Sequence, residues 1–221
     1  MTDKKNIETL KRITFTALLC AIAYVVMLIV HIPLIPGVDY LTYDPKDVII
    51  AIGGFIYGPL TSLAMSLIVS LAEMLTVSHT GLIGFTMNII ASVCFALPAA
   101  LIYKNKRTFA GAILGLCAST LTMTASMLLW NYAITPLYTG MARADIAKIL
   151  PTVFLPFNLF KAILNSAITM FIYRPFVLAM RKAKILSPAN KETNRSNFTI
   201  AVSVISLLII GATVAVMIFI F

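Results

Sequence analysis

The sequence contains few charged residues for its length. Only 11% of its 221 residues are Asp, Glu, Lys or Arg, whereas 60% are hydrophobic, and the mean hydropathy is +0.98. A chain of this composition lies far outside the range of soluble domains, so lipid must be its solvent. The sequence therefore predicts an all-α integral membrane protein.

Cysteine and histidine are also scarce. The three cysteines, Cys20, Cys94 and Cys117, lie in apolar runs without CxxC spacing, and the two histidines, His31 and His79, are far apart. This pattern supports neither a disulfide framework nor a metal site.

Motifs for nucleotide binding and catalysis are missing as well. No segment matches GxxxxGK[ST], so the chain cannot bind ATP through a P-loop. There is no obvious catalytic cluster, and no pair of spans is interrupted at matching positions in two halves, the pattern of inverted-repeat transporters. The sequence predicts a non-enzymatic capture subunit that depends on a partner.

Apolar segments make up most of the chain. We expect spans over residues 13–30, 44–57, 60–77, 82–103 and 109–130, a sixth that holds residues 156–165 and closes at Arg174, and a seventh over 198–221. The second is too short to cross a bilayer alone and must be packed in protein. We expect Asp44 to cap its first turn. The predicted organisation is a six-helix domain (1–183), a cytoplasmic linker (184–197) and an additional C-terminal transmembrane helix (198–221).

The basic residues indicate the orientation. Of the 17 Lys and Arg residues, 13 lie before the first span, after the fourth, or between the sixth and seventh. Because cytoplasmic loops carry the excess of positive charge, we expect a multi-pass plasma-membrane protein with its N-terminus in the cytoplasm. The net charge of +9 is explained by these loops, so nucleic acid is not expected as a partner.

Three polar residues interrupt the sixth span. Asn158, Lys161 and Asn165 are spaced i, i+3 and i+7 and share one stripe of a helix. Polar groups inside a membrane are costly unless they face each other, a cavity or a ligand, which favours a binding role. The alternative is a lysine near a helix end that reaches the headgroups.

Other polar and aromatic residues fall at the same level of the predicted topology. These candidate substrate-binding residues are Tyr43, Glu73, Asn88, Asn131 and Tyr132, together with the Asn158, Lys161 and Asn165 stripe. Convergent amides and rings predict a pocket for a neutral, flat ligand with polar edges, entering from outside, in which Lys161 meets a carbonyl or Glu73. Taken singly, each Asn could instead be a helix–helix hydrogen bond and each Tyr an interface anchor.

Ala17 and Ala21 form a small-xxx-small face on the first span. Such faces allow close approach of another membrane helix, so we expect a partner to dock here, although this spacing is common.

Several of these stretches together carry a family resemblance. They read LTYDPKD at 41–47, GFIYGP at 54–59, SLAE at 70–73, MN at 87–88, WNY at 130–132 and PFNLFK at 156–161. In combination they resemble the riboflavin-specific S component of energy-coupling factor (ECF) transporters, over roughly residues 10–183.

The resemblance implies a six-helix bundle that binds riboflavin from outside and works with a transmembrane T component and two cytoplasmic ABC ATPases. It also implies that the first extracellular loop covers the site, that the amides and Lys161 hold the flavin, and that Ala17 and Ala21 dock on the T component. Residues 198–221 depart from the family pattern. Two alternatives stay open: an S component for another flat vitamin or precursor, and a membrane enzyme built on a Glu73 and Lys161 pair.

Overall fold

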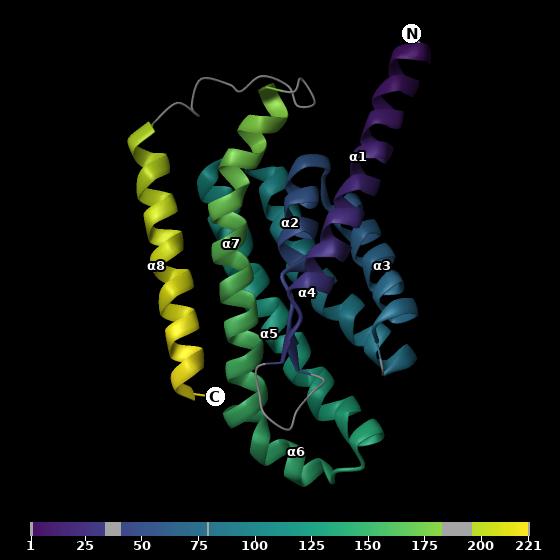
Figure 1. Ribbon diagram of the computed structural model, residues 1–221, viewed down its shortest axis with the longest axis vertical. Helices are drawn as coiled ribbons and strands as arrows, with labels where there is room; N and C mark the ends of the chain where they lie inside the picture. Colours follow the sequence, from purple (N-terminus) through teal and green to yellow (C-terminus); the bar gives the residue numbers. More distant parts are fainter. Residues whose placement is uncertain (1, 34–40, 79, 183–195, 221) are drawn as a thin grey trace.

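The computed structural model describes residues 2–33, 41–78, 80–182 and 196–220, which form a bundle of helices (Figure 1). The elements are α1 (Thr2–Ile29), β1 (Ile32–Pro33), β2 (Thr42–Tyr43), α2 (Lys46–Tyr57), α3 (Pro59–Thr76), α4 (Gly81–Asn105), α5 (Phe109–Thr139), α6 (Arg143–Ile149), the π-helical η1 (Leu150–Phe154), α7 (Leu155–Lys182) and α8 (Ser196–Ile220). The all-α membrane fold is confirmed, with one short antiparallel hairpin, β1–β2, that the sequence did not predict.

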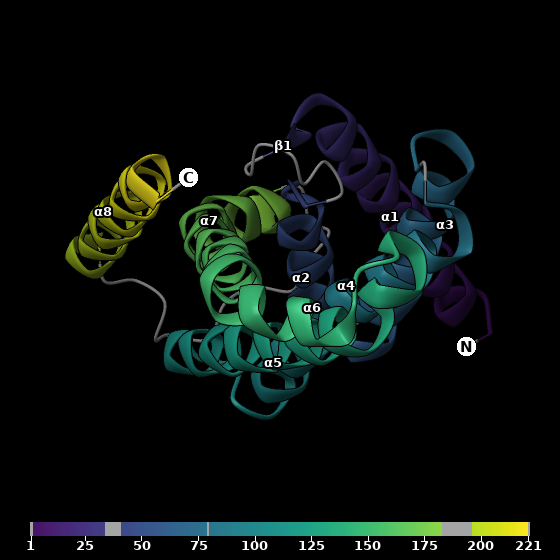
Figure 2. The same ribbon diagram turned by 90° about the horizontal axis from the view of Figure 1, so that it is seen from below.

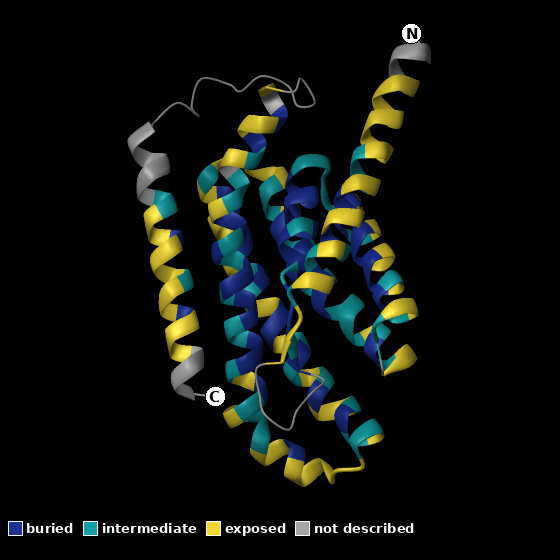
Figure 3. Ribbon diagram, in the orientation of Figure 1, coloured by how far each residue is buried: buried dark blue, intermediate teal, exposed yellow. Residues whose placement is uncertain are grey.

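The short helix α2 lies at the centre of the bundle. It packs against α1, α3, α4 and α7, and most of its 12 residues are buried (Figures 2 and 3). The prediction that this helix is enclosed by protein is confirmed. Its start is not where we expected: the helix begins at Lys46 after Pro45, and no side chain caps it. The prediction that Asp44 is the cap is wrong, because its carboxylate binds lysines instead.

Gly58 joins α2 directly to α3. It has a φ of +95°, a conformation that favours glycine, and Pro59 then begins α3. Arg12 of α1 fixes this turn, since its Nη2 donates to the carbonyl oxygen of Tyr57 at 3.1 Å and to Oγ1 of Thr61 at 2.8 Å. The α2–α3 pair is therefore a tight hairpin anchored to α1.

Small residues bring α4 and α5 together. A Cβ atom on Gly115 of α5 would lie 2.9 Å from the carbonyl oxygen of Ala99 on α4, which only a very close helix pair produces. The prediction that this span is an interior helix is wrong: α5 buries one face against α4 and α7, whereas Leu114, Leu121 and Leu129 are exposed on its outer face. In addition, α5 continues to Thr139, beyond the predicted end at 130, and α7 continues past Pro175, because both helices absorb an internal proline.

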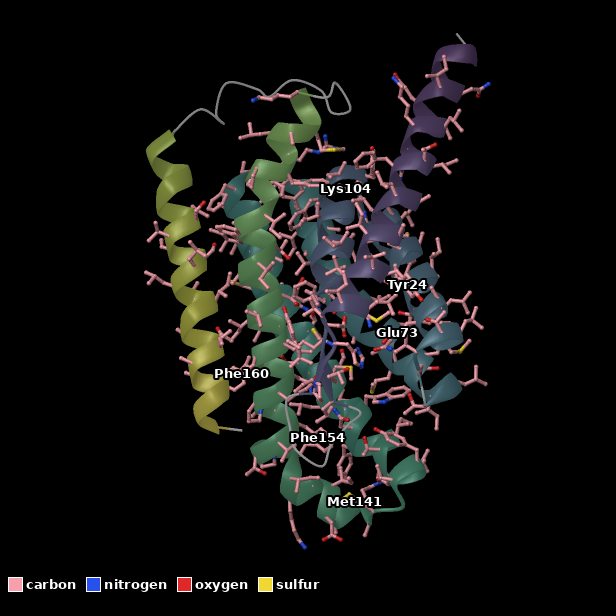
Figure 4. The ribbon with its side chains drawn as sticks, viewed as in Figure 1. Tyr24, Glu73, Lys104, Met141, Phe154 and Phe160 are labelled. Atoms are coloured by element: carbon pink, nitrogen blue, oxygen red, sulfur yellow. The ribbon has the colours of Figure 1, made fainter. Side chains whose placement is uncertain are left out.

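Two ends of the bundle can be distinguished. The N-terminus, Lys104 and the end of α7 lie at one end, whereas the β1–β2 hairpin, α6, Glu73 and Phe154 lie toward the other (Figures 1 and 4). Among the described residues, five helical segments are long and apolar enough to cross a membrane: α1, α3, α4, α5 and the continuous α6–α7 segment. The N-terminal and α7-terminal basic segments thus lie at the end opposite the hairpin, and the cytoplasmic position of the N-terminus stays a prediction.

The additional helix α8 packs along α7 and runs back from the end where α7 stops (Figure 1). Ser206 and Thr213, seven residues apart on one face, are its buried polar residues, while much of its remaining described surface is apolar and exposed. The helix predicted over 198–221 is thus present. The predicted linker lies almost wholly outside the described residues.

Candidate functional site

Four buried charged residues form a continuous chain across the bundle. Lys161 Nζ of α7 lies 2.8 Å from Asp44 Oδ2, Asp44 Oδ1 lies 3.5 Å from Lys46 Nζ, and Lys46 Nζ lies 2.6 Å from Glu73 Oε2 of α3. We call these four residues the charge network. Each is at most 7% exposed, so the opposite charges compensate one another in place of water.

The hairpin explains how Asp44 reaches α7. Ile32 pairs with Tyr43 and Pro33 with Thr42, which holds the chain extended just before α2. Lys161 also donates to the backbone oxygen of Thr42 at 3.3 Å. Lys161 therefore fastens the hairpin to α7 at two points.

The lysines control the ionisation of Asp44. Burial alone would raise its pKa by disfavouring the carboxylate, but Lys161 and Lys46 outweigh this effect and hold the pKa of Asp44 well below its ordinary value. The pKa of Tyr43 is raised, first by burial and then by the negative charges of Asp44 and Asp47. Tyr43 is therefore a neutral hydrogen-bond donor next to an ionised Asp44.

A third acidic residue, Asp47, lies beside the charge network. Asp47, in the first turn of α2, accepts a hydrogen bond from Ser92 Oγ of α4 at 2.5 Å through its Oδ1. Its second carboxylate oxygen is buried and has no hydrogen-bond partner among the described residues. The Oδ2 atom of Asp47 can therefore still accept a hydrogen bond next to the charge network.

The predicted stripe on α7 is buried throughout. Asn158, Lys161 and Asn165 are 2%, 7% and 0% exposed. Tyr43 OH donates to Asn165 Oδ1 at 3.1 Å, so the structure brings the hairpin and the stripe together. The Nδ2 of Asn165 is buried without a partner among the described residues, whereas Asn158 Nδ2 donates to the Phe154 oxygen at 2.8 Å.

Three other predicted site residues, Asn131, Asn88 and Tyr132, differ in how deeply they are buried. Asn131 is fully buried and its Nδ2 donates to the carbonyl of Met127, four residues earlier, at 2.8 Å. Asn88 is half-buried on α4. Tyr132 is 44% exposed, and its ring lies under the guanidinium of Arg143, with the Cζ atom 5.8 Å from the ring centroid.

A small apolar cluster, separate from the main core of the bundle, lies at the hairpin end. Leu41 of the hairpin segment packs with Ile146 of α6, Phe154 of η1 and Phe157 of α7. Pro151 lies in η1 and cannot donate a backbone hydrogen bond, and the helix is locally widened there. This cluster joins the hairpin segment to α6, η1 and α7.

The expected pair of Lys161 with Glu73 is not formed. Asp44 and Lys46 lie between them, so the prediction of direct contact is wrong. Asp44, Lys46 and Asp47 were not among the predicted site residues. The available signal was three charged residues within four positions of a chain that has eight acidic residues in all.

The family model of the substrate-specific component of ECF transporters matches residues 11–173, most of the chain. The chain belongs to this family of S components. It is therefore a membrane-embedded transport component, and the resemblance given by its motifs is confirmed.

Relatives of this S component include the riboflavin transporter RibU of Staphylococcus aureus, 36% identical over 77% of this chain and 93% of the relative. The riboflavin transporter FmnP of Bacillus subtilis is 33% identical over 79% of this chain and 98% of the relative. A solved S component of a bacterial ECF transporter superposes with a TM-score of 0.66 at 33% identity, and covers 78% of this S component and 99% of its own chain. The family match ends at residue 173, so it does not include α8.

Proposed function

We propose that this S component captures riboflavin outside the cell and delivers it inward together with a T component and two ABC ATPases. The observation that carries the proposal is its 36% identity to a riboflavin transporter over 93% of that relative's length. The buried stripe of Asn158, Lys161 and Asn165 supplies the chemistry.

Riboflavin fits the kind of ligand that this site would hold. Its flat ring system carries carbonyl oxygens and ring nitrogens along one edge and is uncharged at neutral pH. Lys161 and the unpartnered Nδ2 of Asn165 are buried donors suited to such acceptors.

The site lies toward the end of the bundle opposite the basic segments, which supports entry from outside. Ala144 of α6 and Asn105 at the end of α4 are exposed and test this orientation. In a chain without its native cysteines, Ala144→Cys should react with an impermeant thiol reagent in intact cells. Reaction of Asn105→Cys instead would reverse the topology.

The partner face is available on α1. Ala17 and Ala21 are exposed on α1, while Leu19, Ala23 and Met27 point into the bundle. The added helix α8 lies beside α7, away from α1 (Figure 2). It therefore leaves the Ala17 and Ala21 face open to a T component.

Titration of the purified full-length protein with riboflavin tests the proposal. Binding should quench the flavin fluorescence and saturate at one ligand per chain. Thiamine and biotin, tested by competition, serve as controls for the alternative that another vitamin is the substrate. Saturable binding of a different vitamin, with none of riboflavin, would contradict the proposal.

A further inference from the structure

Lys46 is one of the largest fully buried side chains among the described residues, at 1% exposed. It lies at the first position of α2 and has a carboxylate on each side, Glu73 at 2.6 Å and Asp44 at 3.5 Å. Burial removes the water that would solvate this cation and therefore costs free energy. We therefore expect Lys46 to have a specific role.

The two contacts of Lys46 are unequal. The contact with Glu73 is a hydrogen bond, whereas the one with Asp44 is an ion pair that is too long for a hydrogen bond. The Oδ1 of Asp44 that faces Lys46 has no hydrogen-bond partner among the described residues, although it is buried. Lys46 thus lies beside a carboxylate oxygen of Asp44 to which its ammonium group does not donate a hydrogen bond.

Lys161 is in the opposite position. Its ammonium group donates to Asp44 Oδ2 and to the backbone oxygen of Thr42. For Lys161 to donate to a ligand, it must give up part of its contact with Asp44. Without another cation nearby, that change would leave a buried carboxylate unpaired, which is strongly unfavourable.

We infer that Lys46 is a positioning residue. When Lys161 donates to the bound ligand, Lys46 becomes the main ion-pair partner of Asp44 in its place. Asp44 then stays paired in both states: through Oδ2 with Lys161 before binding, and through Oδ1 with Lys46 afterwards. Asp47 lies close enough to interact electrostatically with both lysines and with Asp44. The inference rests on the proposed function, because it assigns Lys161 to the ligand.

The alternative is that Lys46 only neutralises Glu73. The variant Lys46→Met/Glu73→Gln separates the two roles, because it removes both members of that pair and keeps the site in charge balance. Glutamine has the same shape as glutamate, and methionine is an unbranched apolar side chain one heavy atom shorter than lysine. If Lys46 only neutralised Glu73, this variant would bind riboflavin as the wild type does. If Lys46 takes over Asp44, its riboflavin affinity should fall at least tenfold while the thermal unfolding midpoint stays close to that of the wild type.

Two further variants complete the experiment on the full-length protein. Lys46→Arg/Glu73→Gln restores a cation beside Asp44 and should recover most of the lost affinity. Lys148→Met/Asp145→Asn removes an exposed ion pair, 2.8 Å long, by matching substitutions and should leave binding unchanged.

Wild-type affinity in Lys46→Met/Glu73→Gln would overturn the inference, as would an arginine variant no tighter than the methionine variant. A general loss of the folded state in both variants of Lys46 would also overturn it, since Lys46 would then be structural. Failure of the wild type to bind riboflavin would instead overturn the proposed function, and this inference with it.

Discussion

Asn165 has one satisfied and one unsatisfied group. Its Oδ1 accepts from Tyr43, whereas its Nδ2 is buried without a partner among the described residues. If the ligand supplies the missing acceptor, Asn165→Ala should weaken riboflavin binding by about 1–3 kcal/mol, the cost of an unmet buried hydrogen bond. Fluorescence titration measures this change, with the exposed Asn105→Ala as the control. Equal affinity in both variants would show that Asn165 contributes only to packing.

The lowered pKa of Asp44 predicts how the stability of the folded protein depends on pH. Its folded-state pKa is lowered by Lys161 and Lys46 despite burial, so the unfolded chain binds a proton more readily than the folded one. The stabilisation should be fully present above the ordinary Asp pKa of about 3.9 and be lost as the pH falls below it. Thermal unfolding midpoints from pH 7 down to pH 3 should therefore decline at the acid end, and decline less in Asp44→Asn. An identical decline in both proteins would assign the acid sensitivity to other groups.

The burial of the α7 stripe could be predicted from sequence because a helical period places Asn158, Lys161 and Asn165 on one face. The partners of Lys161 could not be predicted. They depend on the antiparallel pairing of β1 and β2, two strands of two residues each, which brings position 44 to α7. Lys161 and Asp44 are 117 residues apart in the chain, and no local pattern encodes such a contact. Likewise, the inward direction of Lys46 depends on Glu73 lying on the next helix.

Among the elements, α8 is the one without a counterpart in the family match. It packs on α7, while the charge network and the predicted amides belong to α2, α3, α4, α5, α7 and the hairpin segment. We expect a chain that ends at Lys182 to bind riboflavin with an affinity within a few-fold of the full-length protein. Its unfolding temperature should be lower, because the face of α7 that α8 covers would be exposed. Loss of binding in a truncated chain that still folds would mean that α8 shapes the site.

Helix ends were predicted less well than helix positions. The aromatic and amide residues around Trp130 suggested an end at the membrane interface, but α5 continues for nine residues to Thr139. At Pro136 only one backbone hydrogen bond is lost, and the packing of the surrounding helices outweighs that loss. The sequence pattern also gave no sign of the π-helical turn at η1, because it results from the junction of α6 with α7.

At the scale of the whole molecule, capture and delivery should be separable. Ala17 and Ala21 are exposed on α1 and take no part in the charge network. The double variant Ala17→Leu/Ala21→Leu should keep riboflavin binding in the purified protein but abolish riboflavin uptake by cells, because bulky side chains prevent close packing with a partner helix. Copurification of the T component and ATPases should be lost as well.

A matched variant controls for the added bulk. Ala212 on α8 is also exposed, so Ala212→Leu should leave both binding and uptake intact. Normal uptake in the Ala17→Leu/Ala21→Leu variant would show that the T component uses another face.

The burial of Lys46 also constrains how the chain enters the bilayer during synthesis. Helix α2 is 12 residues long, about 18 Å at 1.5 Å per residue, and begins with a lysine and an aspartate. Such a segment is too short and too polar to leave the translocon for lipid by itself. The carboxylate nearest to Lys46 belongs to Glu73, which is synthesised 27 residues later and near the end of α3. The α2–α3 hairpin should therefore be released into the membrane as one unit, only after most of α3 has been made.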